Sequence, residues 1–328
     1  MEKAKKFTLF GILSIFSLIL LNATDLYTLT SGATALSRIL QFSGPLVLCS
    51  FIISALHAEN KYFKNVLCVA GAYVIWNVIY YILQKDIYSE SFFELTGFAM
   101  QGKYMYISYV VLQMLIILPL LKWVYKRFPI ALITFTLIWT VFFQYSYVTG
   151  TIIYYRIELF LKMKLFFHMW LVYPVMCMFI VDKFDKIVSN KYTLPVAIPG
   201  FIITQLIVYL EAYINDWGWT FVRPSVIFLT FFSAILLCYI VNYLSEFNIV
   251  KAFTGVSERG FSQMYFSFHL FFIIVNSVLQ SRGGIPGLII CAGTTALLTY
   301  GFGIIVTKIK KRLLPVNKTH TLPNEADQ

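Results

Sequence analysis

The chain has 328 residues, of which 59% are hydrophobic and only 12% are charged. Soluble globular proteins carry about 25% charged residues, so this composition excludes a soluble globular protein and indicates an integral membrane protein. A formal net charge of +11 would suit a nucleic-acid-binding protein if the chain were soluble. Here the basic residues lie in short segments between apolar runs, so we expect them to set membrane topology and expect no nucleic-acid partner.

The five cysteines all fall within apolar runs, and their spacing matches no disulfide or zinc framework. We therefore interpret them as small buried hydrophobic residues. The sequence also contains no phosphate-binding glycine loop and no nucleophile elbow. The glycines at 283–287 are interpreted as a turn before the last apolar run. We therefore expect no bound cofactor and no metal.

The hydropathy pattern predicts an all-α polytopic bundle, because a helix needs about 20 apolar residues to cross the hydrocarbon core. Ten such runs are expected, at 7–27, 36–56, 63–83, 104–125, 129–149, 164–181, 194–214, 224–244, 261–279 and 285–306. The sixth run is short and the ninth is interrupted by polar residues. Residues 1–307 are thus expected to form one transmembrane domain, and residues 308–328 a basic and polar tail.

The distribution of Lys and Arg predicts the orientation. With the N-terminus inside, the inner segments hold 18 of the 26 basic residues and the outer segments hold the other eight. Cytoplasmic loops are enriched in Lys and Arg, so both termini are expected in the cytoplasm. The first run, which follows Lys3, Lys5 and Lys6, is expected to stay as an uncleaved span. These features predict a multi-pass protein of a cell membrane, with the bacterial plasma membrane as the expected location.

A short polar elbow, residues 57–64, separates the second and third runs. Lys61 and Lys64 lie three residues apart in it, which places both ammonium groups on one side of the first turn of the third run. A cationic helix start at a membrane surface suits a phosphate-bearing ligand. The simpler alternative is that these lysines only anchor the topology. His57, at the start of the elbow, is interpreted as solvated.

Four stretches resemble the acyltransferase-3 family of membrane acyltransferases, and within it the exopolysaccharide-modifying members of the intercellular-adhesin type. They are Pro45–Phe51, Lys61–Lys64 with Ala72–Tyr80, Gly102–Tyr106 with Val111–Gln113, and Ser262–His269. The order and spacing of these stretches carry the resemblance, which covers most of the chain. Phe51 stands where the family has a glycine. The family also has ten spans, the number that is expected here.

The resemblance implies a membrane-bound O-acyltransferase that modifies a cell-surface or secreted polysaccharide. The donor would be acyl-CoA, either acetyl-CoA or succinyl-CoA, docked at the inner face with its phosphates on Lys61 and Lys64. The acceptor would be a polysaccharide or a lipid-linked glycan. Membrane lipids and other exopolysaccharide-synthesis proteins are the further partners that it implies.

His269 lies inside the ninth run, about 12 Å deep at 1.5 Å per residue. An ionisable residue at such a depth is a functional candidate, and we expect His269 to lie on the path of the acyl group. The alternative is a neutral imidazole that is hydrogen-bonded in the core.

Two residues are candidates for the base that activates an outer hydroxyl. His168, beside Trp170, has an imidazole whose pKa suits general-base catalysis, although a histidine next to aromatic residues at the membrane interface needs no such role. Glu211 follows the apolar run 207–210 and is expected either to orient a base or to pair with Arg223; the alternative is a solvated interfacial charge.

One departure from the family concerns the first span. The family carries an Arg there, then ten residues, then a His taken to be catalytic, whereas this chain has no His before His57 and counting from Lys6 ends on Ser17. The sequence alone therefore leaves a second hypothesis open, a non-catalytic component of exopolysaccharide export. A small-molecule transporter is disfavoured, because no inverted repeat of Gly/Pro-broken spans is present.

Overall fold

A computed structural model describes residues 2–26, 36–57, 62–84, 105–149, 167–214, 221–247, 256, 258–279 and 284–313. Within these ranges every regular element is a helix, and nine of the helices are long and apolar enough to cross a membrane. The predicted fold class, a polytopic helical bundle, is confirmed.

The described ranges contain ten long α-helices and two single turns of 3-10 helix. The α-helices are α1 (Glu2–Leu26), α3 (Ser43–His57), α4 (Tyr62–Gln84), α6 (Met105–Arg127), α7 (Pro129–Thr149), α9 (Val172–Ser189), α10 (Thr193–Ile214), α11 (Pro224–Leu244), α13 (Glu258–Leu279) and α14 (Gly284–Leu313). The 3-10 turns are η1 (Leu40–Phe42) before α3 and η4 (Phe167–Met169) before α9. α14 continues past the boundary expected at residue 307.

The sixth run is the one whose helix differs from the prediction. A span was expected at 164–181, whereas α9 covers Val172–Ser189 and is absent from the nine helices that meet the membrane criteria. Pro174 lies in the first turn of this helix, where a proline costs no hydrogen bond. The helix begins at Val172 and extends beyond the apolar run into the charged segment 182–189.

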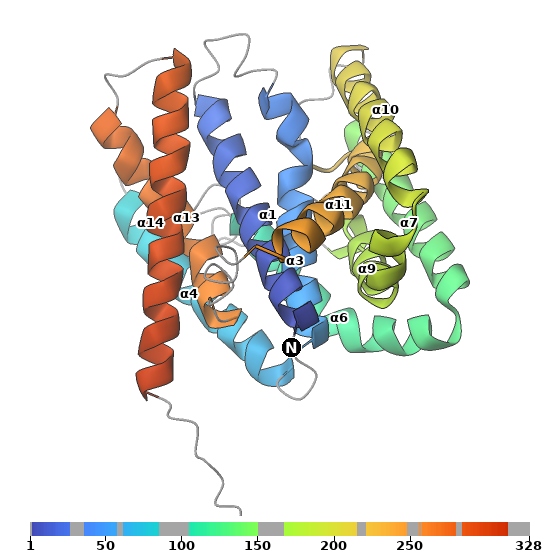
Figure 1. The fold of residues 1–328 in the computed structure, drawn as a ribbon, viewed down its shortest axis with the longest axis horizontal. Helices are drawn as coiled ribbons and strands as arrows, with labels where there is room; N and C mark the ends of the chain where they lie inside the picture. Colours follow the sequence, from blue (N-terminus) through green and yellow to red (C-terminus); the bar gives the residue numbers. More distant parts are fainter. Residues whose placement is uncertain are drawn as a thin grey trace, which may run out of the picture.

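α1 and α3 lie in the middle of the bundle, whereas α10 and α14 lie at opposite edges (Figure 1). The membrane-spanning parts of α1 and α3 are 72% and 78% buried, against 17% for α10 and 28% for α14. α1 begins and α14 ends on the same side of the bundle, the lower side in Figure 1. We call this side the N-terminal face and the other side the opposite face.

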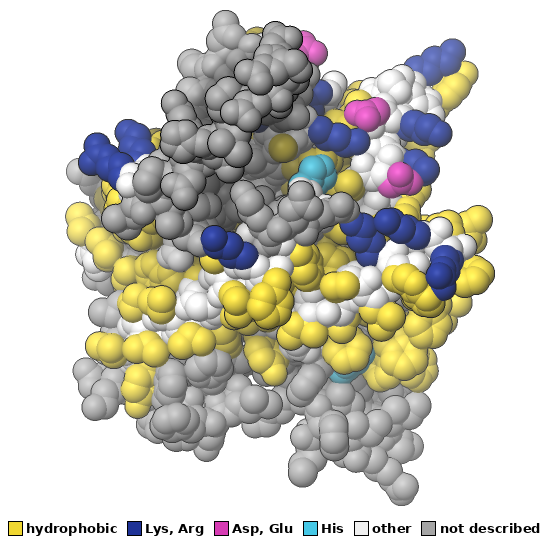
Figure 2. All heavy atoms as spheres, turned by 90° about the horizontal axis from the view of Figure 1, so that it is seen from below, with side chains coloured by type: hydrophobic (Ala, Val, Ile, Leu, Met, Phe, Trp, Pro, Cys, Tyr) yellow, Lys and Arg dark blue, Asp and Glu magenta, His cyan; other side chains and the backbone are white. Residues whose placement is uncertain are grey.

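The N-terminal face carries most of the described Lys and Arg side chains, as Figure 2 shows. On the opposite face, the described basic side chains are those of Arg38 and Arg223. This asymmetry agrees with the orientation expected from the sequence, in which the N-terminal face is cytoplasmic.

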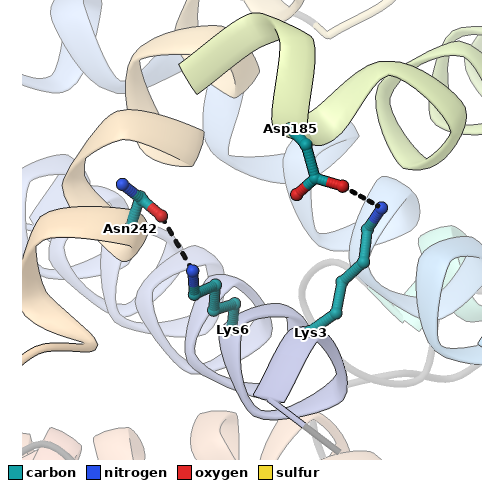
Figure 3. A network of polar contacts seen from close by, with 4 residues as sticks. All are labelled: Lys3, Lys6, Asp185 and Asn242. Atoms are coloured by element: carbon teal, nitrogen blue, oxygen red, sulfur yellow. Dashed lines mark hydrogen bonds and ion pairs between the residues drawn. The ribbon is translucent and has the colours of Figure 1, made fainter. Parts of the chain in front are cut away.

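Two lysines in the first turns of α1 tie that helix to its neighbours (Figure 3). Lys3 Nζ lies 3.2 Å from a carboxylate oxygen of Asp185 in α9, and Lys6 Nζ donates to Asn242 Oδ1 in α11 at 2.8 Å. These contacts fix the start of the central helix at the N-terminal face.

α6 bends so that its last turns lie crosswise at the lower edge of Figure 1. Pro119 lies inside this helix and has no amide hydrogen, so the carbonyl of Leu115 loses its helical partner. The hydroxyl of Tyr62, in the first turn of α4, donates to that carbonyl. The bend in α6 is thereby joined to the start of α4.

α13 and α14 pack closely because glycines face each other. A Cβ atom on Gly303 would lie 2.5 Å from Met264 Cγ, and one on Gly260 would lie 2.6 Å from the carbonyl oxygen of Gly303. Small residues allow helix backbones in a membrane to approach in this way. In contrast, Gly301 of the same helix has nothing within 4 Å of its Cβ position.

The glycine contact predicts a difference between two substitutions in α14. Gly303→Val should lower the free energy of unfolding by about 1–3 kcal/mol, because the side chain must displace Met264 or separate the helices. Gly301→Val should have almost no effect. Denaturant unfolding of both variants in mixed micelles measures the difference, and equal stability of the two would contradict the proposed close contact.

Candidate functional site

Two small cavities adjoin near the N-terminal face, between α1, α3, α4, α6 and α13. The first has a volume of about 70 Å³ and its polar lining consists of Thr8, Ser50, Ser54 and His57. The second, about 30 Å³, has Ser54, Asn65 and Ser262 as its polar lining. Both also contact Phe261. We call these two cavities together the vestibule.

His57 is held at the mouth of the vestibule. Its ring centroid lies 4.5 Å from that of Phe7 in α1, and its Nδ1 lies 3.1 Å from the carbonyl oxygen of Ile53. When Nδ1–H donates to a carbonyl, Nε2 becomes the basic nitrogen. The sequence interpretation of His57 as solvated is consistent with its exposure, but the cavity beside it could not be predicted from the sequence.

Lys64 lies in the first turn of α4 with its side chain exposed, and the next residue, Asn65, lines the vestibule. Lys61 lies outside the described residues. Lys64 thus places a cation beside a polar cavity at the N-terminal face.

Residues 72–80 of α4 and residues 262–269 of α13 lie against each other. Trp76 Nε1 donates to Gln263 Oε1 at 2.7 Å. One turn further along both helices, the hydroxyl of Tyr80 donates to the carbonyl oxygen of Phe266 at 2.7 Å. Two of the stretches that carry the family resemblance, far apart in the sequence, therefore meet in the fold.

The hydroxyl of Tyr80 also accepts a hydrogen bond from the amide of Leu270 at 3.1 Å. Phe266 and Leu270 are four residues apart, so their carbonyl and amide are the groups that pair in a regular α-helix. The Tyr80 hydroxyl therefore joins α4 to the backbone of α13 at this turn. His269 lies in this turn, half-buried, with its ring centroid 5.8 Å from that of Tyr80.

The spacing along the helices separates His269 from the lysines. Lys64 and Tyr80 are both in α4, and their separation corresponds to about 24 Å along the helix axis. Ser262 of the vestibule and His269 are both in α13, about 10 Å apart along the axis. His269 thus lies nearer to the vestibule than to the Lys64 ammonium group, and deep in the bundle.

Tyrosine side chains occupy the region between the vestibule and His269. Tyr265, one turn before His269, is buried and lies beside Ser108 of α6 and close to Tyr73, Tyr80 and Tyr106. The ring of Phe51 lies 5.3 Å from that of Tyr265 and 5.0 Å from that of Phe261. Buried aromatic rings, several of them with hydroxyl groups, therefore fill the bundle between the vestibule and His269.

His168 lies in η4, apart from His269. Its side chain is 7% exposed and its ring packs edge-on against Phe143 of α7, with the centroids 4.7 Å apart. The backbone amide of the preceding residue, Phe167, donates to Gln113 Oε1 at 3.0 Å. Burial among aromatic rings disfavours the charged imidazolium.

Glu211 is placed between α10 and α11 rather than near either histidine. Ser225 donates a hydrogen bond to its carboxylate, and the guanidinium of Arg223 is close enough to attract it. Arg223 is fully buried and donates to the carbonyl oxygen of Val208 at 3.2 Å. Burial lowers the pKa of Arg223 and the charge of Glu211 opposes this, so the two side chains are electrostatic neighbours, as pairing with Arg223, one of the two roles expected from the sequence, requires.

The expected site residues therefore fall into separate places. His269 meets α4 at Tyr80, His168 packs on α6 and α7, and Glu211 pairs with the start of α11. Within the described ranges, no three His, Cys, Asp or Glu side chains are close enough together to hold a metal ion.

Sequence reasoning did not single out Tyr80 and Gln263. The signal was weak: Gln263 is a polar residue in an apolar run, and Tyr80 is one of many tyrosines. Only the pairing of α4 with α13 distinguishes them.

No family model matches the chain, and no curated protein or solved structure matches it significantly.

The two hydrogen bonds of the Tyr80 hydroxyl predict that this group stabilises the folded bundle. Tyr80→Phe removes two hydrogen bonds at a buried position, and it should lower the free energy of unfolding by about 1–2 kcal/mol, less than the loss of a buried ring. Tyr213→Phe, at an exposed position in α10, is the control and should be neutral. Denaturant unfolding compares the two, and a neutral Tyr80→Phe would contradict the importance of the bridge.

The buried guanidinium of Arg223, at the start of α11, predicts a larger loss of stability on substitution. Arg223→Gln should lower the free energy of unfolding by about 3 kcal/mol, because the half-buried Glu211 then loses its counter-ion. Arg312→Gln, exposed at the end of α14, should change it by less than about 0.5 kcal/mol. The double variant Arg223→Gln/Glu211→Gln should recover part of the loss; a purely additive result would show that the two charges do not interact.

Proposed function

We propose that this protein is a membrane-bound O-acyltransferase of the bacterial plasma membrane. It transfers an acetyl or succinyl group from acyl-CoA to a hydroxyl group of a cell-surface or secreted polysaccharide or of a lipid-linked glycan. The observation that carries the proposal is the contact of residues 72–80 with residues 262–269, in which the Tyr80 hydroxyl bonds to the turn of α13 that contains His269.

The vestibule suits the acyl end of the donor. Its two cavities, of about 70 and 30 Å³, are far smaller than the 300–1,000 Å³ of pockets that enclose whole drug-sized ligands. The nucleotide of acyl-CoA would therefore remain at the N-terminal face, where Lys64 and, in the same elbow, Lys61 can attract its phosphates. The narrow pantetheine arm would carry the acyl group inward past the hydroxyl groups of Ser54 and Ser262.

His269 is the residue best placed to act as the base. The transfer forms an ester C–O bond and breaks the thioester C–S bond; the proton of the acceptor hydroxyl passes to the base and then to the leaving thiolate of CoA. A neutral imidazole accepts such a proton. Measured along α4, Tyr80 lies about 6 Å from the helix end at the opposite face, which favours approach of the acceptor from that side.

In this proposal His168 and Glu211 do not carry chemistry. His168 is enclosed by aromatic rings, and Glu211 is engaged by Ser225 and Arg223. Both are more suited to holding α6, α7, α10 and α11 in place than to activating an outer hydroxyl group.

A specific observation favours the second candidate function, a non-catalytic component of exopolysaccharide export. α1 offers no acid or base at the level of the family's histidine: the hydroxyl of Ser14 donates to the carbonyl of Phe10, and that of Ser17 donates to the carbonyl of Ser14. Under this alternative, the vestibule and the tyrosine side chains bind an acylated or lipid-linked glycan without transferring a group.

Assays with purified protein and acyl-CoA separate the two functions. His269→Ala should lower the rate of acyl transfer or acyl-CoA hydrolysis by about 100-fold or more, the range expected for loss of a general base. His168→Ala should have less than about a tenfold effect. Lys61→Ala/Lys64→Ala should raise KM several-fold and leave kcat almost unchanged, whereas Lys308→Ala, at the end of α14, should change neither value.

The matching cellular experiment measures O-acylation of the polysaccharide after deletion of the gene. Unchanged acylation would overturn the proposed activity. Loss of polysaccharide from the cell surface without any turnover of acyl-CoA in vitro would support the export function instead.

A further inference from the structure

A groove on the side of the bundle lies far from the vestibule. α9 forms its floor, and α7 and α11 form its walls. Its volume is about 300 Å³, and its lining has no polar surface. The floor contains Val172, Val175, Met176 and Phe179, which recur at helical spacing along one stripe of α9.

The groove opens to the hydrocarbon region. Its walls include Leu137 of α7 and Phe228 of α11, within two helices that meet the membrane-spanning criteria. The side chains next to it on α7 are exposed and apolar, with Ile138 64% and Trp139 38% exposed. An apolar groove with such surroundings at membrane depth is in contact with lipid.

The apolar stripe on α9 becomes basic at its cytoplasmic end. One turn beyond Phe179 it continues with Lys183, and one turn later with Lys186, so basic side chains follow the groove within about 6–10 Å. The end of α6 reaches the same place, since Tyr125 is an electrostatic neighbour of Asp182 and Lys183. Lys126 and Arg127 follow Tyr125 and are exposed.

The acidic residues at this end are engaged by cations of the chain itself. Asp182 forms an ion pair with Lys183 at 2.7 Å, and Asp185 forms one with Lys3 at 3.2 Å. The side chains that meet the end of the groove therefore have a positive balance. A second copy of this chain would bring the same positive charges against them in a two-fold symmetric contact, which opposes dimerisation through this groove.

We propose that the groove between α7, α9 and α11 binds an anionic phospholipid of the cytoplasmic leaflet. One acyl chain lies in the apolar groove, and the phosphate headgroup contacts Lys183 and Lys186. The cytoplasmic leaflet is rich in anionic lipids, so the ligand is abundant at the face where these cations lie. The site is independent of the proposed acyl transfer, because it lies on other helices and uses other residues.

Native mass spectrometry of the delipidated full-length protein tests the proposal with two probes, phosphatidylglycerol and phosphatidylcholine with matched acyl chains. The wild type should retain phosphatidylglycerol in preference to phosphatidylcholine. Leu137→Trp, which fills the groove, should lower binding of both lipids. Ile138→Trp adds the same ring to the neighbouring exposed position of α7 and should bind both lipids like the wild type.

Lys183→Gln and Lys186→Gln should each weaken phosphatidylglycerol binding by about fivefold and leave phosphatidylcholine binding unchanged, since one surface charge near an anionic headgroup has about that effect. Lys308→Gln is the matched control on another helix.

Thermal unfolding confirms that each variant is folded before lipid binding is compared. Equal binding by the two Trp variants would overturn the groove as the site. An unchanged lipid preference in the lysine variants would overturn the headgroup contact. A dimer in the wild type that Leu137→Trp alone abolishes would show that a second copy occupies the groove and would overturn the proposal.

Discussion

The bridge that Tyr80 makes to α13 connects the features on which the candidate site depends. Its hydroxyl donates to the carbonyl of Phe266 and accepts from the amide of Leu270, the two groups that pair in a regular α-helix. In a membrane, backbone polar groups must be satisfied within the protein, and the Tyr80 hydroxyl is a partner for both. The bridge thereby holds the turn of α13 that carries His269 against α4.

The same principle explains other irregular points of the bundle. Pro119 leaves the carbonyl of Leu115 without a helical partner, and Tyr62 supplies one. At both places a tyrosine of α4 supplies a hydroxyl group to the backbone of another helix, that of α6 from the first turn of α4 and that of α13 deeper in the bundle. α4 therefore joins the vestibule to the region of His269 along its whole length.

The sequence alone predicted most of the helices, because length and hydropathy determine where a helix can cross a membrane. The predicted run 224–244 matches α11 residue for residue, and 129–149 matches α7. The sixth run was shifted because α9 continues to Ser189 through charged residues that hydropathy excludes from a span. Local pattern thus predicts single helices well and fails where a helix continues into a charged segment.

The candidate site was less predictable because its contacts join distant parts of the chain. The sequence pointed to His269 from its depth in an apolar run, but the partners Tyr80 and Gln263 depend on how α4 packs on α13. Glu211 was expected to orient a base or to pair with Arg223, and the second role fits the fold. No sequence pattern indicated that His57 would lie beside Phe7 at the mouth of a cavity.

α1 has no histidine of its own, but the packing of α3 against α1 brings His57 beside it. α1 and α3 lie side by side, and the vestibule is lined by Thr8 from one helix and by Ser50, Ser54 and His57 from the other. An imidazole from α3 thus contacts the first turns of α1 at the N-terminal face, while His269 from α13 lies deeper in the bundle. Two of the chain's histidines thus lie on α3 and α13, whereas α1 carries none. The proposed acyl transfer would therefore require residues of α3 and α13 to act together.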